Sequence, residues 1–199
     1  MKTEQLEKLN EIFQGELKQS ERWLEYWKDF SEPSTWQFWV VLAMFLFPLI
    51  CVILFIDRKK MLHLGFYGYS VHVFFTYSDL IGTHNAYWIY PYKLSPYFPS
   101  SLTLDASFVP VAYMLLYQYT LDKKKNYYIW FGGMCLTFAY IFKPLLLGLG
   151  LFHFRGKENF FLLFLGYLLV ALIAKWITDF FLLLMKSNKF SLYEGKKEV

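Results

Sequence analysis

The sequence has few of the residues that build disulfide scaffolds or metal centres. It contains 2 cysteines and 4 histidines, and neither CxxC nor HxxxH spacing occurs. Cys51 and Cys135 both fall inside long apolar runs, where a thiol behaves as a small hydrophobic side chain. The pattern therefore excludes a disulfide framework and a zinc site, and we expect no metal and no cofactor.

Familiar catalytic and transport signatures are also missing. The chain has no GxSxG nucleophile elbow, no phosphate-binding P-loop and no glycine-rich dinucleotide motif. It shows no internal repeat of the kind that builds inverted-repeat transporters. The first apolar run begins far from Met1, so we expect no cleaved secretory signal. For these reasons the sequence favours binding over catalysis.

Long apolar runs dominate what is present. Hydrophobic residues make up 56% of the chain and aromatic residues 23%. A helix needs roughly 20 residues to cross the hydrocarbon core, a length that four of the runs reach and the third approaches. Uninterrupted runs predict helices, because barrel strands would alternate in polarity. We therefore predict an all-α integral membrane bundle of five transmembrane helices, at about 36–56, 61–81, 102–119, 127–149 and 159–185.

Residues 1–35 are predicted to form an amphipathic interfacial helix outside this domain of residues 36–185. Leu6, Phe13 and Leu17 recur at helical spacing, with glutamate and lysine on the other faces. One interpretation places this helix on the outer membrane surface. The alternative is that it binds a second copy of the chain or a partner membrane protein, as in an accessory or regulatory subunit of a membrane complex.

Basic clusters predict the orientation of the chain. Arg58-Lys59-Lys60, the lysines at 123–125 and a basic tail at 186–199 fall on one side of an alternating five-span path. The positive-inside rule makes that side cytoplasmic. The N-terminus and the loop at 82–101 then lie outside, and the C-terminus is cytoplasmic. The net charge of +4 therefore marks a membrane face, and we expect no nucleic acid partner.

Three ionisable residues are predicted to share one depth in the outer third of the membrane. At 1.5 Å per residue, Asp79 lies roughly 27 Å from the cytoplasmic start of its run, and Lys143 roughly 24 Å along its own. Asp105 begins its run from the outside. A charge at that depth is costly without a partner, so we expect Lys143 to pair with Asp79, Asp105 or both.

This predicted cluster has two interpretations. It is either an ion pair that fixes how three helices pack, or a polar pocket in which Lys143 meets an anionic head group. In the second case the ligand is a membrane lipid or another amphiphile. A further alternative is an enzyme that acts on a lipid or an isoprenoid, with Asp79 or Asp105 as acid and base. The candidate ligand-binding residues are Asp79, His84, Trp88, Tyr90, Asp105 and Lys143.

Lys175 and Asp179 lie four residues apart in the last apolar run. Residues at this spacing share one face of a helix, so we expect a structural ion pair between them.

The motifs around the aspartates resemble one family. They are D-L-I-G at 79–82, W-I-Y-P at 88–91, D-A-S at 105–107 with Pro110, and Y-Q-Y at 117–119. This set resembles an uncharacterised family of small multi-span membrane proteins of spore-forming Gram-positive bacteria. The resemblance implies a bacterial plasma-membrane protein of about five helices and supplies no activity.

A weaker resemblance links the same region to the small membrane cyclase domains of carotenoid synthesis. Those domains carry paired acids after the proline, and the acids protonate a polyene. Here Val111 and Ala112 follow Pro110, so the acid pair is missing.

Overall fold

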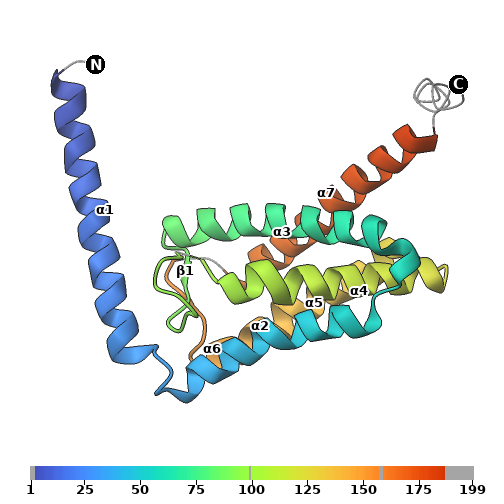
Figure 1. Cartoon of the computed structure of the whole chain (residues 1–199), viewed down its shortest axis with the longest axis horizontal. Helices are drawn as coiled ribbons and strands as arrows, with labels where there is room; N and C mark the ends of the chain where they lie inside the picture. The colour runs from blue at the N-terminus through green and yellow to red at the C-terminus, as the bar shows by residue number, and fades with distance from the viewer. Residues whose placement is uncertain (1–2, 99, 157–158, 187–199) are drawn as a thin grey trace, which may run out of the picture.

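The computed structural model describes residues 3–98, 100–156 and 159–186, and most of these are helical (Figure 1). The all-α prediction is therefore confirmed. The α-helices are α1 (Thr3–Phe30), α2 (Trp36–Phe55), α3 (Met61–His84), α4 (Val109–Asp122), α5 (Tyr127–Thr137), α6 (Lys143–Gly148) and α7 (Phe160–Lys186). Residues 187–199, most of the predicted basic tail, lie outside the described residues.

Three helices are long and apolar enough to cross a membrane, so the chain has the helices of a membrane protein. They are Trp36–Phe55, Tyr127–Gly148 and Phe160–Met185, within the described residues. The sequence predicted five spans, and the other two runs also fold as helices. The helix α3 carries Ser70, His72 and Asp79, and these polar residues lower its mean hydropathy below that of the three.

Two helices of the bundle contain a π-helical turn directly before a proline. The turn η2 (Leu104–Phe108) leads into α4, and η3 (Phe138–Phe142) joins α5 to α6 in one continuous helix. Pro110 and Pro144 follow these turns closely. A proline has no N–H to donate and its ring crowds the preceding turn, so the wider π turn accommodates it.

Short polar side chains set where the helices begin. Thr35 Oγ1 accepts a hydrogen bond from the Phe38 amide, and Asn126 Oδ1 accepts one from the Tyr128 amide at 2.9 Å. In the 3₁₀ turn η1 (Arg58–Lys60), Asp57 Oδ1 accepts from the Lys59 amide at 2.9 Å. Each of these residues satisfies amides that a helix start leaves without partners.

The core of the bundle is aromatic at the end where η1 lies. The rings of Tyr67 and Tyr117 lie 4.2 Å apart, and their neighbour Tyr127 stacks on Phe131 at 4.0 Å. The hydroxyls of Tyr67 and Tyr127 are 2.7 Å apart. Large buried rings contribute most of the packing energy available to so small a bundle.

Gln118 of the Y-Q-Y motif fastens the turn after α2 to α4. Its Oε1 accepts from the Asp57 amide at 2.8 Å, and its Nε2 donates to the Phe55 carbonyl at 2.9 Å. Both backbone groups lie where α2 ends and would otherwise lack a helical partner. A residue that the motif singled out thus has a structural role.

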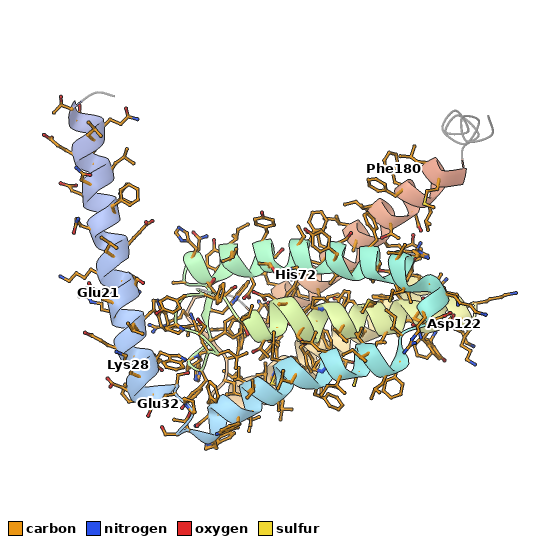
Figure 2. All side chains as sticks on the ribbon, viewed as in Figure 1. Glu21, Lys28, Glu32, His72, Asp122 and Phe180 are labelled. Carbon is orange, nitrogen blue, oxygen red and sulfur yellow. The ribbon has the colours of Figure 1, made fainter. Side chains whose placement is uncertain are left out.

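The helix α1 stands apart from the bundle and crosswise to its helices (Figure 1). It has no buried residue, and Glu21 and Lys28 lie on its open surface (Figure 2). Its C-terminal end is anchored to the loop after α3. Trp27 Nε1 donates to the Lys93 carbonyl at 2.8 Å, and Ser31 Oγ accepts from the Lys93 amide at 2.9 Å.

A small antiparallel ribbon ties two loops together near this anchor. Strand β1 (Trp88–Ile89) pairs with β2 (His153–Phe154), with Trp88 opposite Phe154. The sequence did not predict this pairing, because a strand of two residues shows no detectable alternation. It positions the loop that follows α6 against the loop that follows α3.

Candidate functional site

Asp79 is the centre of a buried polar network at the end of the bundle near the foot of α1. It lies on α3 and is 3% exposed. Its Oδ1 accepts from Trp88 Nε1 at 2.8 Å and from the Tyr90 hydroxyl at 2.7 Å. Its Oδ2 accepts from the Ser101 amide at 3.2 Å. The loop after α3 therefore folds back to supply three donors to one carboxylate, which offsets much of the cost of burying it.

Gly82 lets the loop come this close to α3. A Cβ atom at this position would lie 2.0 Å from Cζ2 of Trp88, so only glycine leaves room for the indole ring. The ring covers the helix surface about one turn beyond Asp79. The glycine of the D-L-I-G motif and the tryptophan of the W-I-Y-P motif are thus complementary in shape.

Lys143 approaches the same network from the helix formed by α5 and α6. It is 1% exposed, and its Nζ donates to the Tyr90 hydroxyl at 3.0 Å. The ammonium also lies 4.0 Å from the ring centroid of Phe152 and 4.8 Å from that of Tyr90. Aromatic faces at these distances attract a desolvated cation.

The pairing expected for Lys143 is therefore indirect. Among the described residues no ion pair joins it to Asp79 or Asp105. The Tyr90 hydroxyl stands between lysine and Asp79 and bonds to both. The reason is geometric, because the loop inserts an aromatic ring where the sequence alone suggested that two helices met directly.

Asp105 completes the cluster from η2. It is 2% exposed and lies close enough to Asp79 and Lys143 to interact electrostatically with both. Its two carboxylate oxygens make no hydrogen bond of good geometry within the described part of the chain, although the side chains of Ser100 and Asp79 interact with them. The three charged residues of the predicted cluster are thus brought together, with one carboxylate fully bonded and the other not.

Backbone chemistry explains why Asp105 is held at this place. Within η2 the Val109 amide donates to Leu104, five residues back. The next amide would belong to Pro110, which has none, so the Asp105 carbonyl loses its helical donor. His72 Nδ1 lies 2.7 Å from that carbonyl and donates to it. Figure 2 labels His72 on α3, the helix that runs beside α4.

A cavity of about 320 Å³ lies between α3 and α7, with Asp79 and Lys143 among its lining residues. Most of its other walls are apolar, including Phe75, Leu163 and Val170. Exposed side chains such as Leu165 also line it, so the cavity opens sideways to the outer surface of the bundle. It is an apolar groove with a charged end.

Tyr167 is a further polar residue of this cavity. Its ring stacks on Phe75 at 5.5 Å, and its hydroxyl is buried without a hydrogen-bond partner among the residues described. A buried hydroxyl normally has a partner. Tyr167 therefore offers an unused polar group beside the groove.

The structure divides the predicted ligand-binding residues. Asp79, Trp88, Tyr90, Asp105 and Lys143 form one cluster, whereas His84 is exposed at the end of α3. Sequence reasoning missed Phe152, Ser101 and Tyr167. Tyr167 shares a buried helix face with Ala171 and Ala174, a spacing that identifies it as inward-facing. Phe152 and Ser101 lie in loops and give no such signal.

Lys175 and Asp179 belong to a different part of the molecule. The lysine Nζ is within salt-bridge distance of the Asp179 carboxylate on the same helix. It also lies 5.5 Å from the ring centroid of Tyr127 and 5.8 Å from that of Tyr117. This pair therefore packs against the aromatic core, away from the Asp79 network.

The fold and this cluster define a class, that of helical membrane proteins with a buried polar network beside an apolar groove on the side of the bundle. The chain matches no family model, no curated protein and no solved structure.

Proposed function

We propose that this protein binds a lipid or another amphiphile in the groove between α3 and α7. The head group lies against Lys143 and Asp79, and the apolar tail lies along the groove. The observation that carries this proposal is the composition of the cavity. A buried lysine and a buried aspartate line one end of it, and most of the other lining residues are apolar. The shape matches an amphiphile, because polarity changes along one continuous surface.

Lys143 has N–H donors to spare, which favours a head group that carries hydrogen-bond acceptors. An ammonium has three N–H donors. In the described part of the chain it donates one hydrogen bond, to Tyr90, and otherwise contacts aromatic faces. A phosphate or carboxylate oxygen accepts from such a donor strongly. The unpartnered hydroxyl of Tyr167 supplies a second polar contact.

The size and openness of the cavity support partial rather than complete enclosure. Ligand pockets commonly have volumes of roughly 300–1,000 Å³, and this one is at the small end. A lipid head group and the first part of one chain fit such a space. The remainder of the tail stays in the bilayer, which the open side of the groove faces.

The proposal includes a five-span topology in a bacterial plasma membrane. The helix α3 has 24 residues, which correspond to about 36 Å and exceed the roughly 30 Å of hydrocarbon. Lys60 forms an ion pair with Asp122, so the basic turns after α2 and α4 lie at one end of the bundle. The network and the foot of α1 lie at the other end, which we assign to the outer leaflet.

A groove-filling variant tests lipid binding directly. Gly166 lines the cavity, and a Cβ atom there meets nothing within 4 Å, so Gly166→Leu fills the groove without a clash at Cβ. Gly132→Leu is the matched control, since Gly132 is equally open but lines no part of this groove. We expect native mass spectrometry to show several-fold less co-purified lipid on Gly166→Leu than on Gly132→Leu. Equal lipid on the two variants would refute the proposal.

A second variant separates ligand binding from packing. Lys143→Met keeps most of the side-chain volume and removes the charge. The proposal predicts loss of bound lipid together with any loss of thermal stability. If the melting temperature falls while the lipid content stays at the wild-type level, the network serves only to pack the helices.

A further inference from the structure

A second cavity lies between the same two helices at the opposite end of the bundle. It has a volume of about 620 Å³ and is formed by the start of α3, the turn η1 and the end of α7. The lining residues are Arg58, Lys59, Lys60, Met61, Leu62, His63, Phe66, Thr178, Phe181, Leu182 and Met185. Figure 1 shows the C-terminal end of α7 standing clear of the bundle, and Figure 2 places Phe180 on that part.

The mouth of this cavity is basic, and its three cations differ in what they contact. Lys60 forms ion pairs with Asp57 and Asp122, and these carboxylates raise its pKa. Arg58 and Lys59 are exposed, and neither side chain forms an ion pair within the described residues. Two positive charges at the mouth are therefore not neutralised by the protein.

The rest of the cavity is apolar and open to the side. Leu62 is 86% exposed and Met185 is 79% exposed, so these side chains face what surrounds the bundle. Phe66 packs on Phe181 with ring centroids 5.1 Å apart, and both rings are partly exposed. Thr178 is no obstacle to an apolar chain, because its hydroxyl donates to the Ala174 carbonyl at 2.8 Å.

We infer that this cavity binds an anionic phospholipid. Its phosphate lies between Arg58 and Lys59, and one acyl chain follows the wall formed by Phe66, Leu182 and Met185. Basic pockets between transmembrane helices are suited to anionic head groups, and the attached chain adds apolar burial. The inference does not depend on the proposed function, because none of these residues lines the groove beside Lys143.

A preference for anionic lipid would also be seen if the basic residues formed no specific site and only attracted any anionic membrane. The chain offers a control for this alternative. Lys124 and Lys125 lie in the turn after α4, are exposed, and do not line the cavity. A double variant at these positions removes the same charge as Arg58→Gln with Lys59→Gln.

The test is a titration of the full chain in detergent with phosphatidylglycerol and with phosphatidylcholine, followed by native mass spectrometry. We expect the wild type and Lys124→Gln/Lys125→Gln to prefer phosphatidylglycerol. We expect Arg58→Gln/Lys59→Gln to bind it roughly 30-fold more weakly, in line with the attraction of two basic side chains for anionic lipid. Equal weakening in both double variants, or no preference for the anionic lipid, would overturn the inference.

Two further arms address the acyl chain. Leu182→Trp fills the cavity, whereas Leu183→Trp changes an exposed neighbour that does not line it. Only the first should weaken binding of phosphatidylglycerol. Soluble glycerol phosphate should not compete with the lipid; if it competes as well as the lipid does, the site recognises free phosphate. Retention of this binding in Gly166→Leu distinguishes the two sites.

Discussion

At the scale of single residues, Tyr90 connects the charges of the buried network. Its hydroxyl donates to Asp79 and accepts from Lys143, and one oxygen thereby satisfies both. Trp88 bonds to the same aspartate oxygen. Alternate residues of an extended segment face the same side, so the W-x-Y spacing brings an indole and a phenol to one carboxylate. The W-x-Y spacing is therefore explained by these hydrogen bonds, without any appeal to a resemblance between families.

Gly82 is predicted to be intolerant of even one methyl group. In Gly82→Ala the new Cβ collides with the Trp88 ring, which must move and lose its hydrogen bond to Asp79. Overpacking of this kind costs about 1–3 kcal/mol. Gly65→Ala on the same helix is the control, because its Cβ meets nothing within 4 Å.

Thermal unfolding in detergent measures both substitutions. We expect a lower melting temperature for Gly82→Ala and an unchanged or slightly higher one for Gly65→Ala, since alanine is the better helix former. A Gly82→Ala protein as stable as the wild type would show that the indole does not pack on α3 as described.

Lys93, in the loop outside the helices, gives a prediction about pH. It is 6% exposed, its Nζ donates to the Phe98 carbonyl at 3.1 Å, and burial lowers its pKa to about 8. In the unfolded chain the pKa of this lysine is 10.5, so the folded state binds the proton more weakly than the unfolded chain does. Below about pH 8 both states are protonated and the cost of burial is complete; it is relieved as the pH rises from about 8 towards 10.5.

The comparison with Lys93→Met isolates this effect from all other titrations. Between about pH 7 and about pH 9.5 the wild type should gain melting temperature relative to Lys93→Met. The backbone of residue 93, which anchors Trp27 and Ser31, is the same in both proteins. Parallel pH profiles would contradict the predicted titration of Lys93.

At the scale of elements, both π turns adjoin the buried cluster and help to position its charged residues. Asp105 lies within η2, and Lys143 directly follows η3. Each turn precedes a proline, and each changes which side chains face inward by adding one residue to the turn. A proline inside a helix opens it locally, because it lacks the N–H that the helix would use. Pro48 differs, because it lies inside α2, which remains α-helical throughout.

The elements also show what a sequence can predict and what it cannot. The five helical runs were evident from apolar length, and the helical rise indicated that Asp79, Asp105 and Lys143 lie near one another. The way in which Lys143 pairs with Asp79 did not follow from the sequence, because the Tyr90 hydroxyl that joins them comes from a loop. Phe152 and Tyr90 reach Lys143 through segments without periodicity, held by strands of two residues.

At the scale of the whole molecule, α3 and α7 define both proposed sites. The two helices run antiparallel, so the end of α3 faces the start of α7 in the groove beside Lys143, and the reverse holds at the second cavity. Within the walls of each cavity the two helices also contact one another, through the stacking of Phe75 on Tyr167 in the first and the contact of Phe66 with Phe181 in the second. One helix pair therefore forms both proposed lipid sites, one towards each end of the bundle.

The topology is the prediction on which this arrangement rests, and cysteine labelling tests it. In a background of Cys51→Ala and Cys135→Ala, single cysteines replace exposed residues: Ser20→Cys in α1, Tyr97→Cys in the loop after α3, and Lys124→Cys after α4. With α3 and α4 both crossing the membrane, the first two sites lie outside and the third inside. A membrane-impermeant maleimide should then label Ser20→Cys and Tyr97→Cys in intact cells, and Lys124→Cys only after permeabilisation.

Labelling of Tyr97→Cys decides between five spans and three. If only Trp36–Phe55, Tyr127–Gly148 and Phe160–Met185 cross, the segment from η1 to the end of α4 stays on one side, and position 97 shares the accessibility of position 124. Polar residues such as those of α3 are costly where a helix faces lipid. His72 and Asp79, however, both form hydrogen bonds within the bundle. A helix whose polar groups are satisfied internally crosses a bilayer at little cost, so we expect the two positions to differ.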